Sequence, residues 1–389
     1  MDPDNVQAIH AKENLINSNN KVKRKLASIQ IIKDVKKLEN SDKLSIAYVL
    51  GWQVVIGLNQ FKKGEKVIYI EVDSLLPSDK EWTQPYKDKK FKIKTCKIRG
   101  ELSQGLIVSL KCLKEHKDIN DNQYSDVEYN YKEGDNVTDF LEIRKYNDDS
   151  ELNQELATTN LHSILFPLEY GFTKTDEDRI QSVPEFIDKF QGHPYYATLK
   201  YDGMSATYFL NIIEAESKHI NKNHLDFYIL SRNKRRPYIK NNCSYSKIAD
   251  KYNIKEKLLK LNANYAIQGE IYGPKIQNNK LKIKDIEFVV FSVFSKQDNK
   301  YLDYLDLIKF CKEQNLPMVE TILEGNCFKF KLDELKNLAK GNYPNTNNMR
   351  EGLVFRTKID WCNNNINSTF GGNRMSFKII NDEFLLKNN

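Results

Sequence analysis

The chain has 389 residues, of which 40% are hydrophobic and 29% are charged. This length predicts two or three domains, and the apolar content is enough to bury their cores, so a chain that is disordered throughout is excluded. Lys and Arg number 60 against 53 Asp and Glu. The resulting net charge of +7 permits a polyanionic partner but does not require one.

The distribution of apolar residues and cysteines argues against membrane and disulfide-rich classes. No apolar run approaches the ~18 residues that a membrane helix needs, and the start of the chain lacks the apolar block of a secretory signal. The 6 cysteines are spread out without a CxxC pair, which is not the pattern of a disulfide framework or a four-cysteine zinc site. We therefore expect no membrane partner, and a cytoplasmic or other reducing intracellular compartment.

The chain opens with a polar lead-in, residues 1–25, that ends in the basic run KVKRK. A run of this kind is either a solvated, flexible stretch or an arm that contacts phosphates, and the composition favours the first. Short strands follow from Leu26 to about Ile143, in the stretches LASIQIIKDV, LSIAYVLGWQVVIGL, KVIYIEV, FKIKTCKIRG and GLIVSL. Four or five strands separated by glycine turns predict a small closed β-barrel over residues 26–150.

Two stretches of this first domain, 40–44 (NSDKL) and 97–106 (KIRGELSQGL), resemble OB-fold tRNA-binding domains, such as the one in phenylalanyl-tRNA synthetase beta chains. A barrel of this type either binds single-stranded nucleic acid or only braces its neighbour, and the sequence leaves both open. Residues 133–141 (EGDNVTDFL) are expected to close the domain. The polar, acidic stretch at 146–160 is the expected boundary.

Beyond the boundary the pattern changes to longer strands mixed with helices. PEFIDKFQ predicts a short helix, with Pro184 at an early position where its missing N–H is tolerated. Further helices are predicted near 247–261, 303–314 and 331–340. Residues 160–389 therefore read as one mixed α+β domain.

The residues ATLKYDG at 197–203 place a lysine at the end of a predicted strand, followed by Asp202 and Gly203. This arrangement suits a lysine nucleophile: the strand holds the amine, Asp202 can hydrogen-bond or hold metal-bound water, and the glycine permits a tight turn. A free lysine has a pKa of ~10.4, so burial, nearby cations or a metal must lower the pKa of Lys200. Alone the motif is weak, because a surface lysine is the default interpretation.

Five further motifs follow in a fixed order: SRN (231–233), QGEIYG (268–273), EFVVFSV (287–293), EGLVFR (351–356) and SFKII (376–380). The ordered series resembles the covalent nucleotidyltransferases, which include ATP-dependent DNA and RNA ligases and mRNA capping enzymes. Residues 174–181 (KTDEDRIQ) look like the RNA ligase 2-like group. Residues 133–141 with Lys145 and Tyr146 look like its Deinococcus/Naegleria-type subgroup, which has an OB domain in front. Only eleven residues follow Lys378, which leaves no room for the C-terminal OB domain of DNA ligases and capping enzymes.

The resemblance implies an α+β fold, with an N-terminal OB-fold β-barrel and an ATP-grasp-like nucleotidyltransferase domain with antiparallel sheets. It implies an ATP-dependent RNA ligase that seals 5′-phosphate and 3′-hydroxyl RNA ends, as in nick sealing during RNA repair. The expected partners are RNA and ATP, the expected cofactor is Mg or Mn, and a monomer is expected.

The same resemblance implies roles for single residues. Lys200 would attack the α-phosphorus of ATP and carry AMP, and Lys378 would stabilise the charge that develops there. Asp202 would support the reactive end through metal-bound water, and Glu351 would hold the divalent ion. Glu270 matches the carboxylate that accepts a ribose hydroxyl.

Two further roles concern the base and the phosphates. Phe291 would lie on the adenine face, with Phe288 the second choice, because alternation puts the two rings on opposite faces of one strand. Both could equally be core residues. Arg232 is a fork donor for a phosphate, although its basic run could be a solvated loop. That run offers three further candidates for RNA phosphates: Lys234, Arg235 and Arg236.

The sequence departs from the family pattern at two points. Leu199 stands where many relatives have a glutamate that reads the adenine amino group. The last motif has Lys378 between Ser376 and Ile380 instead of two lysines spaced K-x-K, and Arg374 could supply the missing charge. Two alternative functions remain: a GTP-dependent capping-type guanylyltransferase, and a non-catalytic RNA-binding protein.

Overall fold

The computed structural model describes residues 25–116, 131–146, 172, 177–213, 224–232, 235–236, 238–240, 243–359 and 375–388. These residues divide into two compact units, the first up to Tyr146 and the second from Phe172. The predicted boundary stretch lies outside the described residues, apart from Tyr146. Within the described ranges, no helix is both long and apolar enough to cross a membrane.

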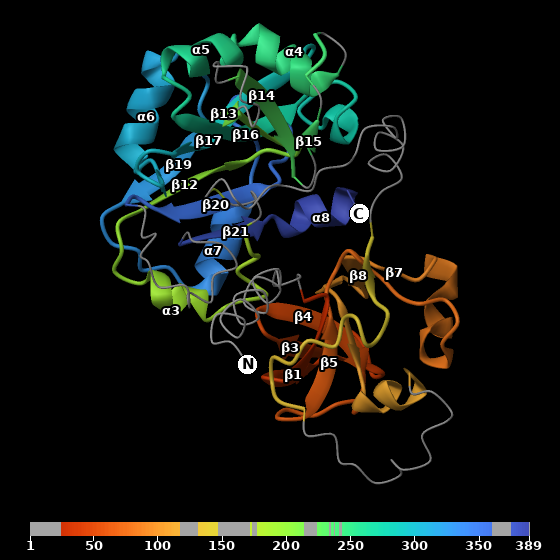
Figure 1. Cartoon of the computed structure of the whole chain (residues 1–389). Helices are drawn as coiled ribbons and strands as arrows, with labels where there is room; N and C mark the ends of the chain where they lie inside the picture. The colour runs from red at the N-terminus through yellow and green to blue at the C-terminus, as the bar shows by residue number, and fades with distance from the viewer. Residues whose placement is uncertain are drawn as a thin grey trace, which may run out of the picture. The chain divides into compact units, whose positions relative to one another are not determined.

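The described part of the first unit contains short strands and two 3-10 helices (Figure 1). Their bounds are β1 (Ala27–Ile31), β2 (Asp34–Lys37), β3 (Leu44–Val49), β4 (Trp52–Gly57), β5 (Lys66–Ile70), β6 (Ser74–Leu75), η1 (Glu81–Lys89), β7 (Lys92–Ile93), β8 (Cys96–Ile98), β9 (Glu101–Ser103), β10 (Leu106–Val108), η2 (Leu110–His116) and β11 (Arg144–Lys145). The strands pair antiparallel in the orders β1-β5-β10, β2-β3-β4, β11-β6-β7 and β8-β9.

Strand β5 shows why this part of the sequence forms a two-sided layer. Ile68 and Ile70 enter one apolar cluster, and Val67 and Tyr69 enter the other, because side chains alternate between the faces of a strand. The turn before β10 needs a glycine: Gly105 has φ +92°, and a Cβ there would lie 2.6 Å from the carbonyl oxygen of Ile70.

The segment expected to close the first domain lies against β1. The Gly134 N–H donates to the Ile29 carbonyl at 2.8 Å, and the Val137 N–H donates to the Ala27 carbonyl at 3.0 Å. The Thr138 hydroxyl accepts the Ala27 N–H at 3.0 Å. Residues 133–141 therefore lie along the edge of β1 and are hydrogen-bonded to its backbone.

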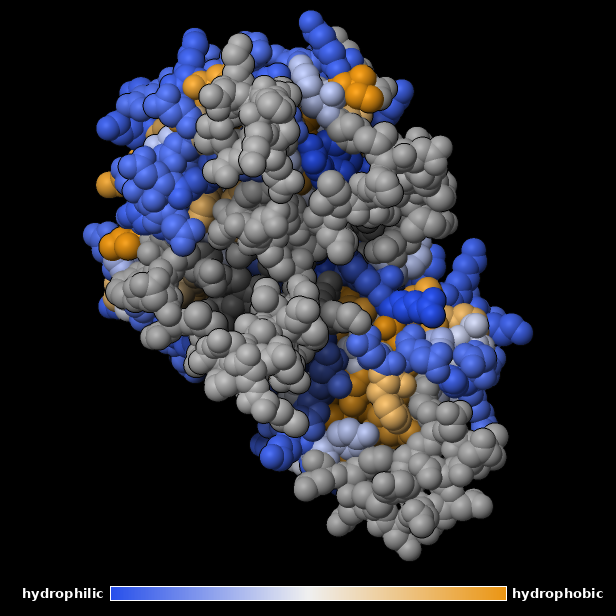
Figure 2. All heavy atoms as spheres, viewed as in Figure 1, coloured by the Kyte–Doolittle hydropathy of each residue, from blue (hydrophilic) through white to orange (hydrophobic). Residues whose placement is uncertain are grey.

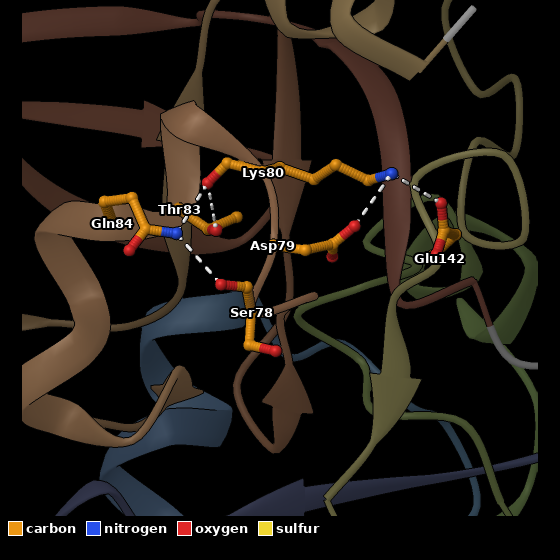
Figure 3. Close-up of polar contacts among 6 residues, drawn as sticks. All are labelled: Ser78, Asp79, Lys80, Thr83, Gln84 and Glu142. Carbon is orange, nitrogen blue, oxygen red and sulfur yellow. Dashed lines mark hydrogen bonds and ion pairs between the residues drawn. The ribbon is translucent and has the colours of Figure 1, made fainter. Parts of the chain in front are cut away.

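A surface ion cluster ties this segment to η1 (Figure 3). The Lys80 amine lies 3.0 Å from Glu142 and 3.3 Å from Asp79. The Lys80 carbonyl, at the start of η1, accepts the Thr83 hydroxyl at 2.8 Å and the Gln84 amide at 3.0 Å. The Thr83 and Gln84 side chains thus satisfy the Lys80 carbonyl, and the Lys80 amine is paired with carboxylates at the start of the helix.

The second unit contains two antiparallel sheets (Figure 1). The six-stranded sheet has the order β15 (Arg235–Arg236), β14 (His224–Ser231), β13 (Met204–Ile213), β16 (Tyr265–Tyr272), β17 (Glu287–Ser295) and β18 (Lys300–Tyr301). The four-stranded sheet has the order β19 (Thr321–Gly325), β12 (Tyr195–Lys200), β20 (Gly352–Thr357) and β21 (Ser376–Ile380). The predicted α+β architecture with antiparallel sheets is confirmed.

Helices cover one face of each sheet. Within the described residues of this unit, the helices are α3 (Phe186–Phe190), α4 (Ser244–Lys251), α5 (Ile254–Lys260), the 3-10 helix η4 (Gln277–Asn279), α6 (Tyr304–Glu313), α7 (Leu332–Ala339) and α8 (Asp382–Asn388). Ile248 of α4, Leu258 of α5 and Leu307 of α6 pack in the core of the six-stranded sheet. Phe190 of α3 and Leu335 of α7 pack in the core of the four-stranded sheet.

The helix predicted at 247–261 is two helices. The chain leaves α4 at Tyr252, and Asn253 has φ +50°, a left-handed conformation that ends a regular helix and that asparagine tolerates. Pro184 lies just before α3, where its carbonyl accepts the Ile187 N–H. Helix α8 was not among the predicted helices; its start is capped by Asn381, whose side-chain oxygen accepts the Glu383 N–H at 3.1 Å.

Among the described residues, eight large hydrophobic side chains are exposed, and two of them, Leu305 and Ile308, lie about one turn apart on α6. Figure 2 shows hydrophilic residues over most of the coloured surface of the second unit in this view and a hydrophobic patch on the first unit. Exposed apolar side chains are common on the surfaces of folded proteins.

Candidate active site

Lys200 is the last residue of β12, and its amine is held inside the second unit. Its Nζ lies 2.6 Å from Glu351 Oε1, and the two side chains are 24% and 14% exposed. The adjacent stretch carries the chain from the four-stranded sheet into β13 of the six-stranded sheet. Gly203 makes this crossing possible, because a Cβ there would lie 2.3 Å from the Ile271 carbonyl oxygen.

The charge state of Lys200 differs from the expected one. Burial lowers the pKa of the amine, but the negative charges of Glu351, Glu270 and Asp202 together raise it, and the balance lies above the ordinary value. The expectation that the surroundings lower the pKa of Lys200 is therefore wrong for the ligand-free protein. The amine is a protonated ion-pair partner until the carboxylate charge around it is reduced.

Glu270 approaches the same amine from the other sheet. It lies on β16, opposite Ser205 of β13 and Val289 of β17. Burial raises the pKa of Glu270 to about 8, the charges of Glu351 and Asp202 add to this, and those of Lys200 and Arg232 oppose it. A carboxyl that is neutral near pH 7 can donate as well as accept a hydrogen bond.

Asp202 has a partner that the motif series does not contain. Its Oδ2 lies 2.8 Å from the Lys280 amine, and the two side chains are 14% and 22% exposed. The same amine lies 4.6 Å from the ring centroid of Phe384, on helix α8. Lys280 thus connects the carboxylate beside the nucleophile to the C-terminal helix.

Glu351 and Lys378 come from neighbouring strands. Glu351 immediately precedes β20, and Lys378 pairs with Val354 of β20 from β21. Burial raises the pKa of Glu351, and the charges of Lys200 and Lys378 oppose this rise. The second carboxylate oxygen of Glu351 is buried and receives no hydrogen bond from any described residue.

That unpartnered oxygen fits a divalent cation, since hard cations prefer carboxylate oxygens. Among the described residues no three His, Cys, Asp or Glu side chains gather as a ligand set. An ion such as Mg²⁺ often takes one or two carboxylates and completes its shell with water and substrate phosphates. Glu351 and Asp202 are the residues that could hold it.

Phe291 and Phe288 point in different directions from β17. Phe288 is fully buried in the helix-covered core, with its ring edge-on to Tyr208 at 5.6 Å. Phe291 lies at a β-bulge: Gln268 and Gly269 of β16 pair with Ser292 and Val290, so Phe291 has no pairing partner on β16. It is only half-buried. Its ring centroid lies 5.7 Å from the guanidinium of Arg356 in the other sheet. The predicted separation onto opposite faces is therefore observed.

Arg356 forms a second polar cluster beside this ring. It is 2% exposed, and its guanidinium lies 2.6 Å from Glu177 and donates to the Thr198 hydroxyl at 3.3 Å. Thr198 shares a face of β12 with Lys200, and Leu199 points the other way into the core of the four-stranded sheet. The side chain at the position of the missing glutamate thus faces away from Lys200.

The structure does not bring all basic candidates to Lys200. Arg232 interacts electrostatically with Glu270. Arg235 and Arg236 form the edge strand β15, where Arg235 stacks over Tyr228 at 3.8 Å and lies 3.8 Å from Asp226. Two further basic candidates, Lys234 and Arg374, lie outside the described residues.

Sequence reasoning missed Lys280, Tyr343, Arg356 and Glu177. Arg356 and Glu177 lie within two stretches used for the resemblance, 351–356 and 174–181, but 179 residues separate them in the sequence. Lys280 lies in a loop with no repeating pattern, and Tyr343 lies in a loop after α7. Their contacts with Asp202 and Lys200 depend on long-range packing that no local pattern reports.

The assembled site has the amine of Lys200, three carboxylates and a second lysine, drawn from both sheets. Such a set can hold a polyphosphate and a cation while an amine attacks one phosphorus. The comparisons with known proteins agree. Residues 26–110 match an OB-fold domain model, and residues 193–380 match the model of the RNA ligase family.

Solved structures of Naegleria gruberi RNA ligase are similar to this chain over most of its length. The structure with PPi has a TM-score of 0.73 at 26% identity and covers 93% of this chain and 98% of its own. A mutant solved with ATP and Mn has a TM-score of 0.73 at 26% identity and covers 94% and 100%.

A curated relative matches as well. The phenylalanine–tRNA ligase beta subunit of Halalkalibacterium halodurans is 28% identical over an alignment of 178 residues, and the match covers 40% of this chain. The match spans 21% of the length of that relative. The predicted OB-fold domain in front of an RNA ligase domain is confirmed.

Proposed function

We propose that this protein is an ATP-dependent RNA ligase that joins 5′-phosphate and 3′-hydroxyl RNA ends through a covalent lysyl-AMP on Lys200. The observation that carries the proposal is the 2.6 Å contact between the Lys200 amine and Glu351, within a cluster that also includes Glu270, Asp202 and Lys378. Similar proteins solved with ATP, AMP or PPi support it.

In the first step, neutral Lys200 attacks the α-phosphorus of ATP. A nitrogen–phosphorus bond forms, the bond between the α-phosphorus and the oxygen that bridges it to the β-phosphate breaks, and pyrophosphate leaves. Lys378 contacts the α-phosphate and stabilises the charge that develops on it. Splitting the condensation into covalent steps replaces one difficult reaction by easier ones.

Lys200 must lose a proton before it can attack. A bound divalent cation would neutralise carboxylate and phosphate charge. Once Glu351 is neutralised in this way, burial becomes the main influence on the Lys200 amine and lowers its pKa, which releases the proton. Adenylylation is therefore expected to speed up with rising pH.

The nucleoside is held by residues from the six-stranded sheet. Phe291 lies on the adenine face, since its ring is half-buried and turned away from the helix-covered core. Glu270 hydrogen-bonds a ribose hydroxyl, which suits a carboxyl with a pKa of about 8. Arg232 contacts a phosphate, and Asp202 supports the reactive end.

The later steps act on RNA. AMP passes from Lys200 to the RNA 5′-phosphate, and the RNA 3′-hydroxyl then displaces AMP to form the phosphodiester. We propose nick sealing in RNA repair as the setting, and a monomer as the acting species. Lys234, Arg235 and Arg236 are proposed contacts for RNA phosphates, so RNA binding should weaken with salt.

A ligation panel tests the proposal. Nicked RNA duplex, RNA–DNA hybrids and single strands are incubated with Mg or Mn and either ATP or GTP. We expect sealing of nicked RNA with ATP only, and no product with Lys200→Ala. Sealing with GTP alone, or equal product from Lys200→Ala, would contradict the proposal. RNA binding without sealing of any substrate would favour a non-catalytic RNA-binding protein.

A further inference from the structure

The hydroxyl of Tyr343 lies between two backbone groups of the candidate active site. It donates a hydrogen bond of 2.9 Å to the carbonyl oxygen of Lys200 and accepts a longer one, of 3.5 Å, from the N–H of Glu351. Tyr343 is 3% exposed. One hydroxyl therefore connects the backbones of two residues that lie 151 positions apart in the sequence.

The ring of Tyr343 is fixed independently of this hydroxyl. Its centroid lies 5.5 Å from that of Tyr201, whose ring in turn lies 4.7 Å from that of Tyr272. The Tyr343 backbone N–H donates to the Asn348 carbonyl at 2.9 Å. Removing the oxygen alone should thus leave the ring in place and break only the polar contacts of the hydroxyl, which also include one with the backbone of Asp202.

The backbone around Glu351 is held from other sides as well. The Arg350 guanidinium donates to the carbonyls of Leu338, Ala339 and Lys340 at the end of α7. The Asn381 N–H donates to the Glu351 carbonyl at 2.8 Å. These contacts anchor Glu351 to α7 and to the start of α8, and Tyr343 adds the link to the strand of the nucleophile.

We propose that Tyr343 is a positioning residue for lysine adenylylation, which holds the backbones of Lys200 and Glu351 at a fixed spacing. The inference rests on the proposed function. Tyr343 acts through the two residues that it bridges, so its hydroxyl controls how well the amine and the carboxylate reach their reacting positions together. Small misplacements of reacting groups reduce rates without changing how much substrate binds.

The test compares two isosteric variants. Tyr343→Phe removes the bridging hydroxyl. Tyr208→Phe is the matched control, because Tyr208 is also fully buried and its hydroxyl donates to a backbone carbonyl, that of Tyr245, at 3.0 Å in the core away from Lys200. For both we measure single-turnover adenylylation, the ATP and Mn concentrations for half-maximal rate, and the melting temperature.

Tyr343→Phe should slow adenylylation at saturating ATP by about 3- to 10-fold, as expected for one lost hydrogen bond, and should require more Mn. Its half-maximal ATP concentration should stay within about 2-fold of the unmodified protein. Tyr343→Phe and Tyr208→Phe should lower the melting temperature by similar amounts. Tyr208→Phe should leave the adenylylation rate unchanged. Equal rates for Tyr343→Phe and the unmodified protein, or equal slowing of both variants, would overturn the inference.

Two further arms separate the outcomes. 3-Fluorotyrosine in place of Tyr343 keeps the ring and the hydroxyl, so it should restore the rate; failure to restore it would count against the hydroxyl as the cause. If the unmodified protein forms no lysyl-AMP, the proposed function itself fails. If the unmodified protein is adenylylated and Tyr343→Phe reacts equally fast, only the positioning role fails.

Discussion

Each unit of the chain holds a lysine between carboxylates, and the two clusters differ in burial. Lys80 in the first unit pairs with Glu142 and Asp79, which are 51% and 68% exposed (Figure 3). Lys200 in the second unit pairs with Glu351, which is 14% exposed. Water screens the first pair, so it contributes to local structure and little else. The second pair lies where charge interactions are strong and are not masked by solvent.

Burial also changes what the carboxylates do. The pKa of Lys80 is raised chiefly by its hydrogen bond to Glu142. Around Lys200, burial also raises the pKa values of Glu270 and Glu351. Burial thus favours the protonated, neutral form of both carboxyl groups. A buried, imperfectly balanced set of charges is costly to a fold and is typical of functional sites. Four predictions test this contrast.

The largest effect is expected for Glu351→Ala. The variant loses the ion-pair partner of Lys200 and the unpartnered oxygen proposed to hold the cation, so adenylylation should slow by at least about 100-fold. The matched control is Glu324→Ala in the same sheet, whose carboxylate lies 2.7 Å from Lys358 but is 52% exposed. The single-turnover rate of label incorporation measures both. If Glu324→Ala is slowed as much, burial is not what distinguishes the clusters.

A smaller effect is expected for Lys280→Met. Methionine keeps the length of the side chain beside Phe384 but removes the charge that lies over this ring and pairs with Asp202, and adenylylation should slow by about 10-fold. Lys251→Met is the control, because Lys251 pairs with Glu287 at 2.7 Å in a more exposed position. An unchanged rate for Lys280→Met would show that Asp202 needs no partner.

Glu270→Gln should change how stability depends on pH. The folded-state pKa of about 8 lies above the unfolded value near 4.5, so the folded form holds a proton that the unfolded form loses, and stability falls between these two pH values. A glutamine at this position does not titrate and adds no such pH dependence to stability. The measured quantity is the melting temperature of Glu270→Gln minus that of the unmodified chain, both without nucleotide. This difference should be about 5 °C larger at pH 8 than at pH 5. Parallel curves would refute the buried, protonated carboxyl.

The smallest effect is expected for Lys80→Ala. Its carboxylate partners are exposed, so the melting temperature should hardly move and the adenylylation rate should stay at the unmodified level. Thermal melting and the labelling rate check both statements. A marked loss of either would give the surface cluster a role that its exposure does not predict.

The sequence predicted the parts of this contrast that depend on local pattern. Alternation predicted most strands, and it separated Phe288 from Phe291 because the two lie an odd number of residues apart. The lysine followed by Asp202 and Gly203 was recognisable as a reactive turn for the same local reasons. The break at Asn253 and the short helix α8 were missed, since single residues determine both.

Other features could not be predicted because they arise from packing across sheets. The pKa of Lys200 depends on Glu351 and Glu270, which lie far away in the sequence and reach the amine from different strands. The expected lowering was wrong for this reason: burial was foreseen, but the sum of three carboxylate charges was not. The Lys280–Asp202 pair and the Tyr343 bridge are likewise visible only in the folded chain.

The central claim is that Lys200 becomes covalently bound to AMP. The most direct measurement incubates the unmodified protein with ATP and Mn, digests the denatured product, and locates the added mass by tandem mass spectrometry. We expect one AMP on the peptide that contains Lys200, on the lysine side chain, and none in Lys200→Ala. AMP on a different residue, or label that persists in Lys200→Ala, would contradict the account.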